Sequence, residues 1–269
     1  MKRLFSGIKQ LVAIVSCFCI IFIHSSFSPL VSNYVSHAGA AADSYKKATG
    51  LYDFFSLTNP FIPAYPTFSF YLSKTPLYES LQLNEAGLSR EAFELGLIGM
   101  EKLLNEGRAV KNNILSIVDF SQPSGQKRLY VIDLDNHSLL FNTWVAHGRN
   151  SGRQMAASFS NKYSSNKSSL GFYLTGDTYT GKHGYSLKLT GLEKGVNDNA
   201  LNRSIVVHGA DYVNGLLASL GYIGRSQGCP AISKLEFKPI IDNIKEGTCF
   251  FIYYPLTSYL EHSPLLNWN

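Results

Sequence analysis

The sequence has few cysteines and, beyond residue 40, no concentration of basic residues. Four of its 269 residues are cysteine, and only Cys229 and Cys249 lie beyond residue 40. Two cysteines exclude the multi-disulfide framework of small secreted domains, although a single disulfide between them stays possible on spacing alone. Beyond residue 40 the chain has no Lys/Arg cluster and no stripe of alternating aromatic and basic residues, so we expect no nucleic-acid partner.

The chain also lacks an apolar run of comfortable membrane-spanning length. The run from Leu11 to Ile23 follows three basic residues and precedes a small, polar stretch in which Ala38 and Ala40 form an A-x-A pattern. This order predicts a secretory signal over residues 1–40 and an exported protein, periplasmic or associated with the cell envelope. An uncleaved N-terminal anchor, or lipid attachment at Cys17, are the alternatives.

Removal of residues 1–40 would take away three basic and no acidic residues. It would leave 21 basic against 19 acidic residues and lower the formal charge from +5 to +2. We divide the rest into a helical and irregular segment (41–110), a catalytic domain (111–256) and a C-terminal tail (257–269). In the first segment, Ser89 is a predicted helix N-cap, apolar residues from Phe93 to Leu104 share one helix face, and Gly107 is expected just past the helix end.

From residue 114 the pattern changes to short β-branched and aromatic runs. A hairpin is predicted from Arg128 to Ala146, with a turn at "DNH". Cys249 lies in the continuous apolar run "TCFFIYY", which predicts a buried strand, and the preceding "SKLEFKPIIDNIKEG" predicts a short helix that ends at Gly247. The predicted fold is therefore mainly β, a sandwich or barrel with a few short helices.

One histidine and one cysteine are placed as a catalytic pair would be. His208 ends the apolar stretch "SIVVHGA", and Cys229 lies in the glycine-bearing "GRSQGCPAI". A thiol becomes a useful nucleophile when a base removes its proton and backbone N–H groups await the oxyanion. Seventeen residues separate His208 from Ser226, enough for the chain to leave the strand and return beside it.

The blocks "VAHGRNSG", "SSLGFYLTG", "GKHGYSLKL", "HGADY" and "GRSQGCPA" occur in this order. Together they resemble the murein L,D-transpeptidase catalytic domain over about residues 88–254, most of the chain beyond residue 40. The family's motif is a histidine, fourteen to seventeen residues, and then Ser/Thr-His-Gly-Cys. The resemblance implies that Cys229 is the acylated nucleophile, that His208 is the general base, and that the Gly209 carbonyl orients its ring. It also implies that backbone N–H groups of Gly228 and Cys229 stabilise the oxyanion, in a turn that begins at Ser226.

The chain departs from the family motif at two points. Gln227 replaces the motif's second histidine, and a Pro-Ala pair replaces the hydrophobic-Arg pair after the cysteine. We therefore assign the missing cationic role to Arg225. Gln227, His183 and Tyr185 are further candidates for substrate binding. His183 and His147 could each have either a structural role or a role in the site. The histidines lack the close spacing of metal ligands, so we expect no metal and no cofactor.

The resemblance implies an enzyme that acts on peptidoglycan stem peptides. Attack by a second stem's amine on the acyl-enzyme gives a 3-3 cross-link or exchanges the terminal D-amino acid, and attack by water makes the enzyme an L,D-carboxypeptidase. Carbapenem β-lactams are the implied covalent inhibitors. A protein of another class also fits: a non-catalytic cell-wall-binding protein of the same fold, which the replacement by Gln227 favours and the retention of His208 and Cys229 opposes.

Overall fold

The structure is a computed structural model that describes residues 73–108 and 110–267. The predicted signal over 1–40 lies outside the described residues, as does the part of the next segment up to residue 72. The described helices and strands are α4 (Leu77–Ser80), α5 (Arg90–Asn105), β1 (Lys111–Asp119), β2 (Leu129–Asp133), β3 (Ser138–Thr143), β4 (Val145–Ala146), β5 (Gly171–Gly181), β6 (Gly184–Gly191), β7 (Val206–Ala210), α6 (Gly215–Ser219), β8 (Ala231–Ser233), α7 (Phe237–Ile244), β9 (Thr248–Tyr253) and α8 (Thr257–Leu260). No helix within these residues is long and apolar enough to cross a membrane.

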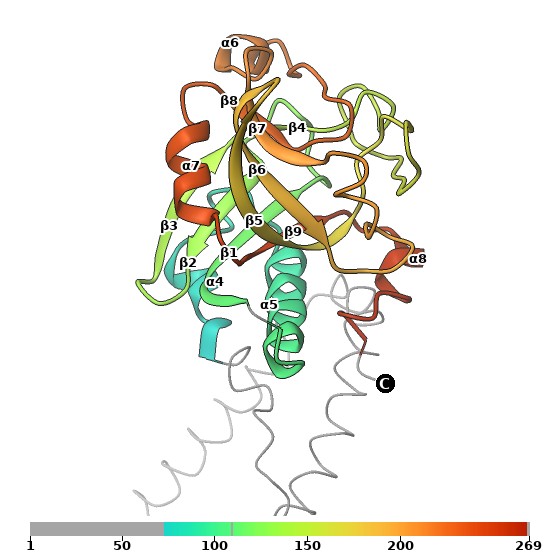
Figure 1. Cartoon of the computed structure of the whole chain (residues 1–269). Coiled ribbons are helices and arrows are strands. Elements are labelled where there is room, and N and C mark those ends of the chain that lie inside the picture. The colour runs from blue at the N-terminus through green and yellow to red at the C-terminus, as the bar shows by residue number, and fades with distance from the viewer. Residues whose placement is uncertain (1–72, 109, 268–269) are drawn as a thin grey trace, which may run out of the picture. The chain divides into compact units, whose positions relative to one another are not determined.

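One sheet of nine strands, in the order β3-β2-β1-β9-β5-β6-β7-β8-β4, organises the molecule (Figure 1). The pairs β1–β9 and β7–β8 are parallel and the others are antiparallel. The two edge strands are consecutive in the chain, since β3 ends at Thr143 and β4 begins at Val145. The sheet is therefore nearly closed on itself, and the predicted mainly β fold with few short helices is confirmed.

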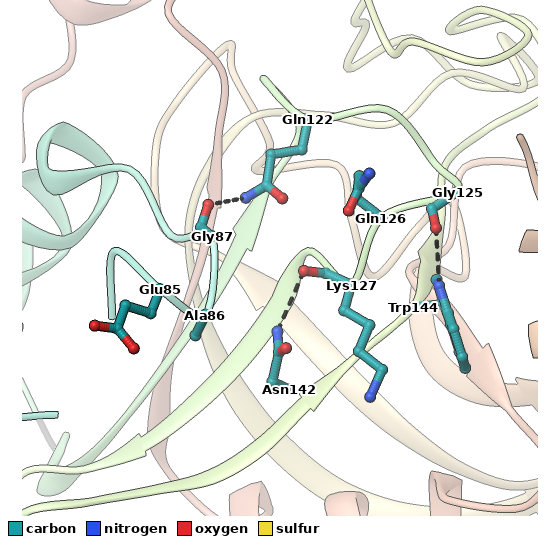
Figure 2. A pocket seen from close by; sticks show the side chains of 9 residues that line it. All are labelled: Glu85, Ala86, Gly87, Gln122, Gly125, Gln126, Lys127, Asn142 and Trp144. Atoms are coloured by element: carbon teal, nitrogen blue, oxygen red, sulfur yellow. Dashed lines mark hydrogen bonds between the residues drawn. The ribbon is translucent and has the colours of Figure 1, made fainter. Parts of the chain in front are cut away.

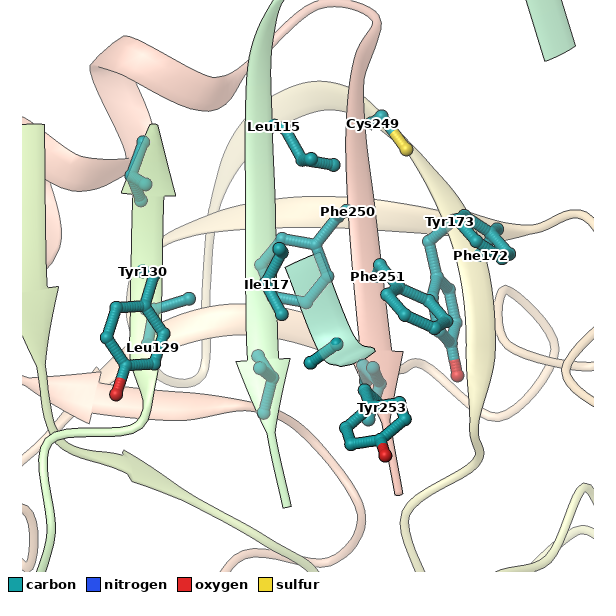
Figure 3. Packing of buried hydrophobic residues seen from close by; sticks show 14 of the residues in the cluster. Leu115, Ile117, Leu129, Tyr130, Phe172, Tyr173, Cys249, Phe250, Phe251 and Tyr253 are labelled. Atoms are coloured by element: carbon teal, nitrogen blue, oxygen red, sulfur yellow. The ribbon is translucent and has the colours of Figure 1, made fainter. Parts of the chain in front are cut away.

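The core lies on the central strands, where aliphatic and aromatic side chains pack together (Figure 3). All six residues of β9 are buried, and the rings of Phe172 and Phe251 stack with centroids 4.1 Å apart. Burial of a side chain of this size stabilises a fold by about 2–3 kcal/mol. Cys249 is fully buried in β9, so the prediction of a packed strand around it is confirmed. Within the described residues, neither Cys249 nor Cys229 forms a disulfide; both are free thiols.

Helix α5 packs against β1 and β9. The Ser89 side chain accepts a hydrogen bond from the Ala92 N–H, as an N-cap does. Gly107 follows the helix with φ +67°, in the left-handed region that favours glycine. A Cβ on Gly99 would fall within 2.0 Å of the Phe172 ring, so glycine there lets the helix approach the sheet. Both ends of this predicted helix are confirmed.

The predicted hairpin and the late helix also form. β2 and β3 pair antiparallel from Leu129 with Thr143 to Asp133 with Ser138. The hairpin is shorter than predicted, because Val145–Ala146 form β4 and pair with β8 instead. Helix α7 is followed by Gly247, with φ +99°, and packs against β6 and β7. This helix covers the strand that carries the candidate base.

Candidate active site

Strand β7 holds His208 in a buried, fixed orientation. Its register pairs His208 with Ser186 of β6 on one side and with Ala231 of β8 on the other. The ring Nδ1 lies 3.1 Å from the Gly209 carbonyl oxygen. A carbonyl only accepts hydrogen bonds, so Nδ1 carries the proton in the neutral ring and Nε2 is left as the acceptor. Burial lowers the pKa of His208, and the neighbouring His183 lowers it further, so the ring is neutral at neutral pH.

Cys229 lies in a turn that Ser226 closes. The Ser226 hydroxyl donates to the Cys229 carbonyl at 2.6 Å and accepts from the Gly228 N–H at 3.0 Å. The Ser226 backbone is fixed in turn by the segment after β4, because its N–H donates to the His147 carbonyl and its carbonyl accepts from the Arg149 N–H. The Gly228 N–H is thus already hydrogen-bonded within the turn. It could donate to an oxyanion only after its hydrogen bond to Ser226 breaks.

The thiol of Cys229 is half-buried and donates to the Ser204 carbonyl across 3.6 Å. Burial raises the pKa of this thiol, while a hydrogen bond with the Val206 backbone and the charge of Arg203 oppose the rise. No hydrogen bond joins the thiol to His208 in the described part of the chain. However, Cys229 lies two residues before Ala231, the partner of His208. Cys229 therefore lies in the turn that leads into the strand beside His208.

His183 and Tyr185 occupy different environments. The His183 ring, in the turn between β5 and β6, stacks on His208 with centroids 4.3 Å apart and planes 22° from parallel. Tyr185 instead donates its hydroxyl to Asp242 of α7 at 2.6 Å. Because Ser186 is the residue paired with His208, its neighbour Tyr185 points to the opposite face of the sheet. The structure therefore brings His183, and not Tyr185, to the candidate base.

Gln227 and Arg225 are both exposed. One Arg225 nitrogen donates to the Arg149 and Gly152 carbonyls at 3.4 and 3.3 Å. Arg225 lies at the edge of the turn, on the side of the segment after β4.

His147 is buried and has a structural role. The Arg128 guanidinium lies 2.7 Å from His147 Nδ1, and the Gly152 carbonyl lies 3.2 Å from Nε2. A guanidinium only donates, so Nδ1 accepts and Nε2–H donates to Gly152. Burial, followed by the charge of Arg128, lowers the pKa of His147 to about 4. The neutral ring supports the segment that holds Ser226 in place.

Arg203 is the residue of the site that the sequence analysis missed. It lies five residues before His208, in "NRSIVVHGA", and its guanidinium binds the serine-rich segment 158–170 at four positions. The same segment reaches the turn that holds Cys229, because Ser168 donates from its hydroxyl to the Gly228 carbonyl at 3.2 Å. Nothing in the local sequence pattern around Arg203 indicated a role in the site.

A separate cavity lies beside the β2–β3 hairpin (Figure 2). Its lining includes Gln122, Lys127, Asn142 and Trp144, and none of the predicted site residues. The indole N–H of Trp144 is held by the Gly125 carbonyl at 3.0 Å. No group of three or more histidine, cysteine, aspartate or glutamate side chains suited to a metal ion occurs within residues 73–108 and 110–267.

Comparison with protein families gives one clear match. The family model described as "L,D-transpeptidase catalytic domain" matches residues 84–253, more than half of the chain. That stretch includes α5, the whole sheet, and both His208 and Cys229. A search of curated proteins finds no match.

Solved structures with a similar fold are distant. An L,D-transpeptidase from Mycobacterium smegmatis is 13% identical, with a TM-score of 0.34, over 53% of this chain and 59% of that chain. The L,D-transpeptidase LdtMt1 in complex with imipenem is 14% identical, with a TM-score of 0.33, over 52% and 59%. The helical cell shape determining protein Pgp2 from Campylobacter jejuni is 14% identical, with a TM-score of 0.37, over 60% and 57%. The chain therefore spans about three fifths of each of these proteins.

Proposed function

Because this chain belongs to the L,D-transpeptidase catalytic domain family, we propose that it is an exported enzyme that cleaves peptidoglycan stem peptides through an acyl-enzyme on Cys229. The observation that carries the proposal is that Cys229 lies in the turn just before β8, the parallel neighbour of the strand that carries His208, and that the Gly209 carbonyl orients the His208 ring. Export rests on the composition of residues 1–40. In this family Cys229 corresponds to the nucleophile and His208 to the base.

In the first step the thiol proton passes to Nε2 of His208, which the Gly209 contact leaves free to accept it. The resting thiol points to Ser204, so the Cys229 side chain rotates toward the imidazole when substrate binds. Catalytic hydrogen bonds are often loose before substrate arrives. The low pKa of His208 suits a base that is neutral before the reaction.

The thiolate then attacks the carbonyl between the third residue of the stem, a diamino acid, and the terminal D-alanine. The negative charge on the carbonyl oxygen is met by the Cys229 N–H, and by the Gly228 N–H if Ser226 releases it. Collapse breaks the amide bond, His208 returns its proton to the departing amine, and a thioester remains on Cys229. A second nucleophile then attacks the thioester and releases the Cys229 thiol. The side-chain amine of a second stem gives a 3-3 cross-link, and a free D-amino acid replaces the terminal residue. Attack by water hydrolyses the thioester, and the enzyme then acts as an L,D-carboxypeptidase.

The decisive test is covalent capture by a carbapenem, followed by peptide mass spectrometry that locates the adduct. We expect an adduct on Cys229 in the wild type and in Cys249→Ala, and none in Cys229→Ala. Cys249 is the matched control because it is free but fully buried in β9. A folded wild-type protein that forms no adduct on Cys229 would instead indicate the non-catalytic wall-binding protein, whose exposed Gln227 replaces the motif's second histidine.

A further inference from the structure

Arg203 makes four hydrogen bonds to one short segment. One nitrogen of its guanidinium donates to the Ser160 carbonyl at 2.8 Å and to the Ser169 hydroxyl at 2.5 Å. The other donates to the Lys167 carbonyl at 2.5 Å and to the Ser165 hydroxyl at 3.3 Å. No carboxylate pairs with Arg203 in the part of the chain that the structure describes. Its positive charge is therefore fixed in position and not neutralised by an acidic neighbour.

The same guanidinium lies against the catalytic turn. A Cβ built on Gly228 would lie 3.3 Å from an Arg203 nitrogen and 2.8 Å from the Lys167 carbonyl oxygen. Gly228 has φ +125°, so the turn both needs glycine and has no space for a side chain on this side. The missing side chain at Gly228 lets the cation approach the backbone next to Cys229.

We propose that Arg203 is a positioning residue that places a positive charge beside the Cys229 turn, seats segment 160–169 against that turn, and so favours the thiolate form of Cys229. Arg203 thereby takes the cationic role that the sequence analysis assigned to Arg225. This inference rests on the proposed function in one respect, the identity of Cys229 as the reactive group.

The other titratable groups near the thiol do not supply this charge. Tyr212 interacts with Cys229, but burial raises the pKa of Tyr212 to about 12, so its hydroxyl is neutral. His208, on the neighbouring strand, is neutral at neutral pH because its pKa is lowered. Lys167 directs its ammonium group to the Ser158 hydroxyl at 2.7 Å. These groups are unchanged in the variants below, so a difference between variants reports Arg203.

The test measures the rate of alkylation of Cys229 by iodoacetamide from pH 5 to 10, with peptide mass spectrometry to locate the label. We expect Arg203→Gln to raise the midpoint pH by about one unit, and to slow alkylation near neutral pH about tenfold, since an opposite charge nearby lowers a pKa by about 1–3 units. Arg203→Lys keeps the charge and should keep the midpoint. Arg225→Gln, the matched loss of an exposed arginine, should leave the profile unchanged.

A second pair of variants keeps Arg203 and decides the matter if Arg203→Gln does not fold. Ser165→Asp places a carboxylate against the guanidinium and should raise the midpoint, whereas the neutral Ser165→Asn should not. If Arg203 only stabilises the fold, every folded variant should have a lower melting temperature and an unchanged midpoint pH for Cys229 alkylation. That result would overturn the inference. The carbapenem adduct is read separately: its absence, with the midpoint shifted as expected, would reject the proposed function and leave the role of Arg203 standing.

Discussion

Replacement of His147 tests how burial controls protonation in this fold. The ring is fully buried between Arg128 and the Gly152 carbonyl, and its pKa is lowered from 6.5 to about 4. In the unfolded chain the same histidine takes up a proton near pH 6.5. The contribution of His147 to stability is therefore fully present above pH 6.5 and is lost as the pH falls from 6.5 to about 4. At about 1.4 kcal/mol per pH unit, the loss amounts to about 3 kcal/mol.

His147→Asn removes the titratable ring and keeps a neutral side chain that can both accept and donate a hydrogen bond. The free energy of unfolding is measured by urea titration at pH 8, 6.5, 5 and 4, because differences between variants cancel the titration of all shared groups. We expect the variant to be less stable than the wild type at pH 8, and the gap to close by about 3 kcal/mol by pH 4. A gap that stays constant from pH 8 to pH 4 would refute the assignment of a neutral, buried ring.

The remaining predictions concern the turn that holds Cys229 and the proposed base. Gly228→Ala should lower the free energy of unfolding by about 3 kcal/mol or more, because its Cβ meets the Lys167 carbonyl at a strained positive φ. Gly195→Ala, also at positive φ but with open space around it, should cost only about 1 kcal/mol; equal losses by urea titration would contradict the close approach at Gly228. His208→Ala should slow carbapenem acylation by about 10²–10⁴-fold. Gln227→Ala should slow it by about tenfold or less, since at most a neutral hydrogen bond is lost; normal acylation in His208→Ala together with loss in His183→Ala would move the base to His183.

Local elements were predictable from the sequence because their signals are local. Ser89 and Gly107 mark the two ends of α5 by capping preferences, and the hairpin at 129–143 follows from two β-rich runs around a polar turn. The burial of Cys249 follows from a continuous apolar run. Each of these depends on neighbours within a few residues.

Long-range features of the site were not predictable in this way. The parallel pairing of β1 with β9 joins strands more than a hundred residues apart, and no local pattern specifies it. The face to which Tyr185 points depends on strand register, and a shift of one residue would reverse it. The contact of Arg203 with the turn depends on three segments meeting in space, so only the structure separates it from Arg225.

The parallel pairing of β7 with β8 sets a lower limit on the number of residues between the proposed base, His208, and the proposed nucleophile, Cys229. A hairpin cannot join parallel neighbours, and the return path across the sheet takes about a dozen residues or more. The connection between Ala210 and Ala231 has twenty residues, so deletions that leave fewer than about a dozen should be tolerated poorly. Inserted residues should be accepted at α6, where Leu216 and Leu220 are 77% and 70% exposed. The tip of this connection is therefore a suitable place to attach a fluorescent label without disturbing a strand.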